Sequence, residues 1–145
     1  MKIFIDADAC PVVAIAEHIA RDYGIASTLV CDYAHQLSSS YSEIITTSTG
    51  ADSADYLLLS LLKKGDIVVT QDYGLAALSL AKGAKAINQN GMVYTSENID
   101  SLLNARHMGA KLRRSGAHLK GPQKRTPQMN AQFEQSFRKL IEASL

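Results

Sequence analysis

The chain has 145 residues, of which 46% are hydrophobic, so one domain can bury a sizeable core without disulfide support. No apolar run approaches the roughly 20 residues that span a bilayer, and the first residues have the pattern of a strand rather than of a signal peptide. The two cysteines lack metal-motif spacing and are too few for a disulfide framework. We therefore expect a cytoplasmic protein that makes no membrane contact. The net charge of +1 conceals an acidic body, with six Lys and Arg against twelve Asp and Glu in residues 1–100, and a basic end, with nine against two in residues 101–145.

The first half of the chain alternates runs of strand character with runs of helical period. Pro11 suits the first turn of a helix that Gly24 ends. The leucines of residues 52–64 predict a second, largely buried helix, with Gly65 as its stop. The polar, Ser-rich residues 32–42 are expected to form a surface loop. The strands expected around these segments are residues 2–6, 25–31 and 43–47.

The second half continues the alternation and ends in helices. After a turn at residues 88–91, residues 92–94 are expected to form a short sixth strand. Ser96 or Asn98 is expected to cap a helix that reaches about Arg114. The remaining expected elements are strands at residues 66–70 and 84–87, a helix at 73–82, a loop at 115–127 and an amphipathic helix at 128–144.

Strands that alternate with helices predict an α/β fold in three layers, α/β/α, with a mainly parallel central sheet. We expect one domain, residues 1–145, with a basic C-terminal helical segment from about residue 101. No acidic residue occurs between Ser101 and Phe133, which predicts contacts with the phosphates of a nucleic acid. Alternatively, this segment neutralises the acidic body of its own subunit, or of a neighbouring subunit in a homo-oligomer. The candidate phosphate ligands are Arg106, Lys111, Arg113, Arg114, Lys120, Lys124 and Arg125.

Acidic residues follow two of the expected strands. Asp6 and Asp8 come at the end of the first strand, and Asp72 follows the strand at residues 66–70. Ligands of open parallel sheets bind outside the carboxyl ends of the strands, so these side chains can meet at one edge. Gathered carboxylates repel one another unless a proton or a cation intervenes. The sequence therefore predicts a Mg²⁺ or Mn²⁺ site, because these cations prefer oxygen ligands.

Some acids near this edge have structural alternatives. Asp8 lies just before the first helix and can cap it. Asp52 fits the N-cap of the second helix, whereas Asp55, three residues on, can face the site. Thr70 is placed to orient Asp72 or to contact a phosphate. Asp52 and Thr70 would then support the site rather than form it.

Several motifs in a fixed order resemble the YaiI/YqxD family of bacterial proteins, over nearly the whole chain. They are DADACP at residues 6–11, DSAD at 52–55, GDIVVTQDYGLA at 65–76, RRSG at 113–116 and GP at 121–122. The resemblance is specific because separate motifs agree in order. The family name itself implies no activity.

More distantly, the layout resembles PIN-like domains, which are metal-dependent nucleases. Their acidic residues stand after the first strand, at the start of a central helix and after a strand that ends in Thr-x-Asp. Asp6, Asp55 and Asp72 match these three places. The resemblance implies that these residues are catalytic and, with Asp8, bind Mg²⁺ or Mn²⁺. It implies hydrolysis of phosphodiester bonds in RNA or DNA, with RNA as the first expectation.

Two other functions stay open. A phosphatase of the haloacid dehalogenase type has a similar Asp-x-Asp motif, with Asp6 as the nucleophile and Asp8 as the acid and base. Its later Gly-Asp motif follows a strand, however, whereas Gly65 and Asp66 precede one. The other alternative is a non-catalytic, PIN-like nucleic-acid-binding protein whose metal site is vestigial or structural.

Overall fold

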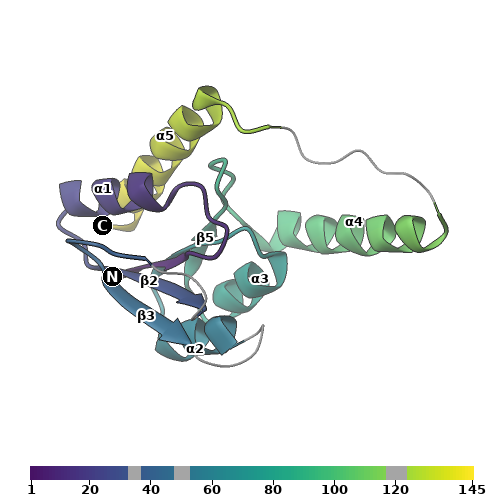
Figure 1. Ribbon diagram of the computed structural model, residues 1–145, viewed down its shortest axis with the longest axis horizontal. Coiled ribbons are helices and arrows are strands. Elements are labelled where there is room, and N and C mark those ends of the chain that lie inside the picture. Colours follow the sequence, from purple (N-terminus) through teal and green to yellow (C-terminus); the bar gives the residue numbers. More distant parts are fainter. Residues whose placement is uncertain (33–36, 48–52, 117–123) are drawn as a thin grey trace.

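Five parallel strands form one central sheet, in the order β3-β2-β1-β4-β5, and helices cover both of its faces (Figure 1). The computed structural model describes residues 1–32, 37–47, 53–116 and 124–145. The strands are β1 (Ile3–Asp6), β2 (Ser27–Asp32), β3 (Glu43–Thr47), β4 (Ile67–Val69) and β5 (Lys85–Ile87), and the helices are α1 (Val13–Asp22), α2 (Ser53–Leu61), α3 (Tyr73–Ala81), α4 (Ser96–Arg114) and α5 (Pro127–Ser144). In the part of the chain described, none of these helices is long and apolar enough to cross a membrane.

The side chains of β1, β2, β4 and β5 alternate between two cores, one on each face of the sheet. In β1, Ile3 and Ile5 belong to the core that α1 and α5 cover, whereas Phe4 belongs to the core that α2, α3 and α4 cover. Both faces are therefore buried, which explains why β1 and β4 read as unbroken apolar runs rather than as alternating ones. The predicted three-layer α/β/α fold with a mainly parallel sheet is confirmed.

The strand order places a topological switch point between β1 and β4. The chain runs outward from β1 through β2 to β3, then returns to add β4 and β5 on the other side of β1. Ile5 and Val69 are in register, so Asp6 and Thr70 stand at the carboxyl ends of neighbouring strands. Open α/β sheets bind their ligands at such points.

The expected sixth strand at residues 92–94 is not formed. The antiparallel pairing there is a single bridge between Ile87 and Val93. The segment between the preceding turn and α4 is short. The Asn88 side chain closes that turn by accepting from the Met92 amide (2.9 Å), and α4 begins two residues after Tyr94. Too few residues remain for a ladder.

The N-cap of α4 also differs from the prediction. Thr95 holds this position, rather than Ser96 or Asn98. Its hydroxyl accepts from the Asn98 amide (3.1 Å), and the Asn98 side chain accepts from the Thr95 amide (2.9 Å). This reciprocal pair is a capping box in which Asn replaces the usual Glu or Gln.

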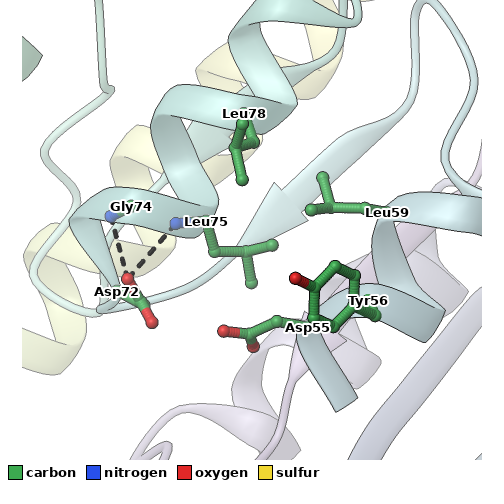
Figure 2. A pocket seen from close by; sticks show the side chains of 7 residues that line it. All are labelled: Asp55, Tyr56, Leu59, Asp72, Gly74, Leu75 and Leu78. Atoms are coloured by element: carbon green, nitrogen blue, oxygen red, sulfur yellow. Dashed lines mark hydrogen bonds between the residues drawn. The ribbon is translucent and has the colours of Figure 1, made fainter. Parts of the chain in front are cut away.

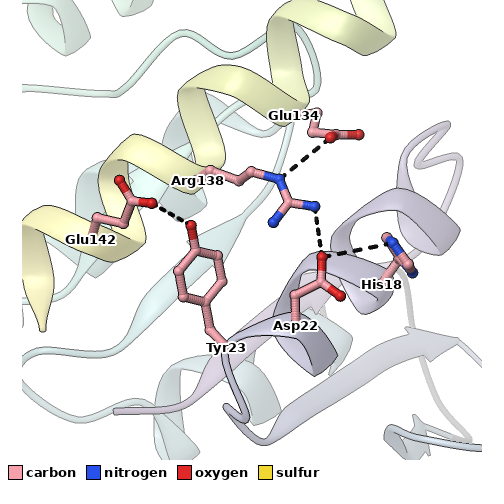
Figure 3. Close-up of polar contacts among 6 residues, drawn as sticks. All are labelled: His18, Asp22, Tyr23, Glu134, Arg138 and Glu142. Carbon is pink, nitrogen blue, oxygen red and sulfur yellow. Dashed lines mark hydrogen bonds and ion pairs between the residues drawn. The ribbon is translucent and has the colours of Figure 1, made fainter.

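Helix α5 returns to the first helix and packs against it (Figure 3). Its buried Phe133 and Phe137 stack with ring centroids 5.2 Å apart, inside the core that β1 and α1 share. Polar pairs close the rim of this contact, and Figure 3 shows them as Arg138 with Asp22 (2.7 Å) and Tyr23 with Glu142 (2.6 Å).

Candidate active site at the carboxyl edge of the sheet

An acidic pocket lies at the carboxyl ends of β1 and β4. It has a volume of about 330 Å³, and we call it the carboxylate pocket; its lining is Asp6, Asp8, Gln71, Asp72 and Tyr73. The structure thus brings together three acids from two separate segments of the chain. Their assignment as catalytic or metal-binding residues stays a prediction.

Buried Thr70 connects the two strand ends from inside. Its hydroxyl donates to Asp6 Oδ2 (2.7 Å) and accepts from the backbone amide of Asp72 (3.0 Å). The hydroxyl of buried Tyr94 donates to the Thr70 carbonyl (3.1 Å). Burial raises the pKa of Tyr94, which keeps this donor neutral. Thr70 therefore positions the Asp6 carboxylate directly and positions Asp72 through the backbone of its turn.

Asp6 is a carboxylate in an unfavourable electrostatic environment. Burial first, and then repulsion from Asp55, Asp8 and Asp72, raise its pKa from 3.8 to about 6, against the lowering effect of the Thr70 hydrogen bond. All three neighbouring acids therefore lie within electrostatic reach of Asp6. A cation or a proton at this edge would relieve the repulsion.

Asp8 does not cap the first helix. Its two oxygens accept from the backbone amide of Asp32 at 3.3 and 3.2 Å, which connects the segment after β1 to the end of β2. The N-cap of α1 is Val12, which makes no side-chain capping bond. Asp8 is thus held at the rim of the carboxylate pocket by a neighbouring strand.

The turn between Asp8 and α1 is strained. Ala9 adopts a positive φ of 56°, a conformation that its Cβ disfavours. The side chain of Gln71 donates to the Ala9 carbonyl (2.7 Å) and so holds the turn against the end of β4. Strain of this kind concentrates at functional sites, where the surrounding structure maintains it.

Asp72 has one oxygen engaged by its own helix and one turned to the site. Oδ1 accepts from the amides of Gly74 (2.8 Å) and Leu75 (3.2 Å), as the N-cap of α3. Figure 2 shows the other oxygen on the side of Asp55, whose carboxylate points toward it from α2. Between them lies a second pocket of about 240 Å³, here called the tyrosine pocket, lined by Asp55, Tyr56, Leu59, Asp72, Gly74, Leu75 and Leu78. Asp72 lines both pockets, so they adjoin.

The donor set at this edge suits one hydrated Mg²⁺ or Mn²⁺. In the described part of the chain, no three His, Cys, Asp or Glu side chains are grouped closely enough to hold a metal ion by themselves. Mg²⁺ does not require such a cage, because it keeps several waters and binds one or two carboxylates together with substrate phosphates. The ligands that the carboxylate pocket offers are oxygen atoms, without His or Cys, which disfavours Zn²⁺.

The basic candidates separate by position. Four belong to α4, which extends away from the sheet (Figure 1): Arg106, Lys111, Arg113 and Arg114. Lys124 and Arg125 lie just before Thr126, the N-cap of α5. Lys120 lies outside the described residues, as does the acidic candidate Asp52.

Arg125 reaches the carboxyl edge of the sheet. Its Nε, Nη1 and Nη2 donate to Asn130 Oδ1, Asn90 Oδ1 and the Gln89 carbonyl, each at 2.7 Å. The third pocket there, the arginine pocket, has a volume of about 420 Å³ and is lined by Ala9, Pro11, Gln71, Gln89, Asn90, Arg125 and Met129. Because Gln71 also lines the carboxylate pocket, the tyrosine, carboxylate and arginine pockets follow one another along the edge.

Three residues at this edge were not found by reasoning from the sequence. Gln71 carried a usable signal, since a polar residue directly after a buried strand faces the ligand edge. Tyr94 supports the site from a distant segment, which a local pattern cannot reveal. Tyr56 is 76% exposed beside Asp55, and exposure of a helical aromatic depends on tertiary packing.

Asp66 lies at the opposite edge of the sheet, because it directly precedes β4. Its buried carboxylate accepts from the amides of Lys2 (2.9 Å) and Lys63 (2.8 Å), so it closes the turn before β4. The Gly65-Asp66 pair is therefore far from the carboxyl ends of the strands. It cannot supply the second motif of a haloacid-dehalogenase-type phosphatase.

Comparisons with known proteins find one family over nearly the whole chain. The family described as "Uncharacterized BCR, YaiI/YqxD family" matches residues 4–143. A UPF0178 protein of Clostridium acetobutylicum is 51% identical over 143 residues, 97% of either chain, and one of Exiguobacterium sibiricum is 52% identical over 141 residues, 97% of this chain and 96% of its own. One of Oceanobacillus iheyensis is 46% identical over 144 residues, 97% and 99% of the two chains. No solved structure gives a significant match.

Proposed function

The chain belongs to the YaiI/YqxD family, as its motifs predict, and we propose that it is a metal-dependent nuclease that hydrolyses phosphodiester bonds of RNA, or of DNA, at the carboxylate pocket. The observation that carries the proposal is the gathering of acids from β1, α2 and the β4–α3 turn at the switch point of the sheet. Their mutual repulsion at Asp6 is what a bound cation would offset.

Asp6, Asp55 and Asp72 are the proposed catalytic residues, with Asp8 as a further metal ligand. Thr70 and Tyr94 are positioning residues, since they hold Asp6 and the Asp72 turn without lining the pocket. A bound Mg²⁺ or Mn²⁺ supplies a water of lowered pKa and neutralises charge on the phosphodiester. Asp6 must lose its proton before it can bind the cation, so its raised pKa makes binding sensitive to pH near 6.

Two features beside the acids favour a nucleic acid over a small phosphate ester. The tyrosine pocket presents the exposed ring of Tyr56 next to Asp55, and aromatic rings of this kind stack on bases. On the other side, Arg125 places a positive charge in the arginine pocket, which adjoins the carboxylate pocket. A polymer is long enough to contact all three pockets.

A second candidate function is a nucleic-acid-binding protein without catalysis. This function is favoured because two of the acids have structural roles. Asp72 caps α3, and Asp8 accepts from the Asp32 amide. In that case the acids remain because the fold uses them, and the basic residues alone provide affinity.

A cleavage assay separates the two. Fluorescently labelled RNA and DNA oligonucleotides, single-stranded and duplex, are incubated with the protein in Mg²⁺, in Mn²⁺ or in EDTA. We expect cleavage that needs the metal and is lost in Asp72→Asn, which removes charge but retains a capping side chain. Asp100→Asn, at an exposed position of α4, is the matched control and should cleave normally.

Full cleavage by Asp72→Asn would refute the proposed mechanism. Salt-sensitive binding without cleavage in either metal would instead identify the binding protein.

A further inference from the structure

We propose that the arginine pocket binds a phosphate group of the nucleic acid, next to the phosphodiester at the carboxylate pocket. The proposal rests on the function proposed above, since it takes one strand to occupy both pockets. Gln71 lines both, and its amide is fixed by the Ala9 carbonyl at their boundary. A group bound in one pocket is therefore a close neighbour of a group bound in the other.

Arg125 carries a positive charge that suits a phosphate. Its three hydrogen bonds go to amide and backbone oxygens, all of which are neutral. In the part of the chain that the structure describes, no carboxylate forms an ion pair with it, whereas Arg138 pairs with both Asp22 and Glu134. Among the described residues, three of the five guanidinium N–H groups are engaged, which leaves two for a ligand. Arg125 is thus a positioned cation whose charge is not balanced locally, which suits an oxyanion.

The turn that holds Arg125 is rigid. The Asn88 side chain accepts from the amides of Asn90 and Met92, each at 2.9 Å, and Ser136 of α5 donates to the Gly91 carbonyl. Gly91 has a φ of 91°, and a Cβ there would lie 2.8 Å from the carbonyl oxygen of Gln132 in α5. The guanidinium is therefore oriented before any ligand arrives, which reduces the entropy cost of binding.

The lining of the arginine pocket also contains a polar atom without a hydrogen-bond partner among the described residues. This atom, Gln89 Oε1, is buried. Buried polar atoms without partners cost free energy, and a phosphate, whose oxygens accept hydrogen bonds, removes that cost only when the amide turns its NH₂ group into the pocket. Rotation of the amide about its terminal bond places its NH₂ group there instead, as a donor to a phosphate oxygen. Arg125, Gln71 and Gln89 then provide one charged and two neutral polar groups around the same space.

The experiment measures binding rather than cleavage. Affinity for a fluorescently labelled single-stranded RNA is measured by anisotropy in EDTA over a range of KCl concentrations. The slope of log affinity against log salt reports the number of phosphates contacted. Arg125→Gln should reduce that slope by about 0.7, the value for one phosphate of a single strand. Arg138→Gln, which removes an arginine with acidic partners on the α1 side, should leave the slope unchanged.

A second variant tests the pocket while Arg125 and its hydrogen bond to the Gln89 carbonyl are retained. Gln89→Glu leaves the backbone carbonyl that Arg125 uses and places a negative charge in the pocket. It should weaken binding and reduce the slope in the same direction, while unfolding by urea stays close to wild type. Oligonucleotides with a 5′-phosphate or a 5′-hydroxyl end distinguish the source of the phosphate. If the pocket takes a terminal phosphate, the wild type prefers the 5′-phosphorylated oligonucleotide and Arg125→Gln loses that preference; if it takes an internal one, the wild type shows no preference and the variant binds both more weakly by the same factor.

The proposal is overturned if folded Arg125→Gln and Gln89→Glu keep the wild-type slope, or if the wild type binds no oligonucleotide. Its failure is distinguishable from failure of the nuclease proposal. Unchanged slopes together with metal-dependent cleavage that Asp72→Asn loses would remove only the phosphate pocket. Reduced slopes without cleavage would retain the pocket and remove the nuclease.

Discussion

At the scale of single residues, the site is defined by charge that the fold leaves unbalanced. Asp6 is partly buried among other acids, and the hydroxyl of Thr70 is the contact that favours its ionised form. The positions of Asp6, Asp8 and Asp72 at one edge could be predicted, because residues that directly follow parallel strands share that edge. The support from Tyr94 and the arginine pocket could not, because both depend on contacts between segments far apart in sequence.

The charge of Asp6 should lower stability above its pKa. The folded protein binds this proton more tightly than the unfolded chain, since the pKa rises from 3.8 to about 6 on folding. Stability conferred by protonated Asp6 is therefore present below pH 4 and lost as the pH rises to about 6. Asp6→Asn should be more stable than wild type at neutral pH by up to about 3 kcal/mol, and equal to it near pH 4. Urea unfolding at the two pH values measures this, and a variant that gains nothing at neutral pH would contradict it.

Thr70 should set the pH at which Asp6 binds a cation. Thr70→Val removes the hydrogen bond that lowers the pKa of Asp6, so that pKa should rise further. The midpoint of the pH dependence of Mn²⁺ binding should then move upward from about 6. Thr70→Ser keeps the hydroxyl and is the matched control, with an expected midpoint close to wild type. Equal midpoints for the valine and serine variants would show that the hydroxyl does not control this carboxyl.

At the scale of elements, caps and turns position the site. Strand and helix types were predictable from apolar runs and helical period, and a glycine marked the end of each of the first three helices. The wrong predictions concern element ends: residues 92–94 are too short for a strand, and Thr95 caps α4 through its contact with Asn98. Several neighbouring residues at the start of a helix can be of types that form caps, so the sequence alone does not identify which polar residue forms the capping bond.

The cap of α3 should separate the structural and chemical roles of Asp72. Asp72→Ala removes the oxygen that accepts from Gly74 and Leu75, and should cost about 1 kcal/mol of stability. Asp72→Asn retains an accepting oxygen and should stay within about 0.5 kcal/mol of wild type. Urea unfolding compares the two. If both variants are equally destabilised, the charge of Asp72 is itself structural, and its use as a chemical probe would be compromised.

At the scale of the whole molecule, the sheet order brings the acids together and α5 brings Arg125 to them. The switch between β1 and β4 joins residues from the start and the middle of the chain. The packing of α5 on α1 then places Arg125, which lies just before α5, at the same edge. The three-layer fold was predictable from the alternation of elements. The strand order was not, because the sequence of a buried, apolar parallel strand does not indicate which strands it pairs with.

The docking of α5 should depend on its apolar face and little on its ion pairs. Phe137 is fully buried against Phe133, so Phe137→Ala should cost about 3–5 kcal/mol. Arg138 is partly exposed, and Arg138→Ala should cost less than about 1 kcal/mol despite its bonds to Asp22 and Glu134. The free energy of unfolding in urea measures both. A larger loss for Arg138→Ala than for Phe137→Ala would mean that the polar rim, and not the core, holds this helix.

The most direct test of the central claim is a calorimetric titration with Mn²⁺ at a pH above 7, where Asp6 is ionised. It needs no substrate, and it compares the wild type with Asp6→Asn, Asp72→Asn and the exposed control Asp100→Asn. If acids from β1 and from the β4–α3 turn form one cation site, the wild type and the control bind Mn²⁺, and each site variant binds at least about tenfold more weakly. If the wild type does not bind Mn²⁺, or both site variants bind it as tightly as the wild type, these acids do not form a cation site and the account is wrong.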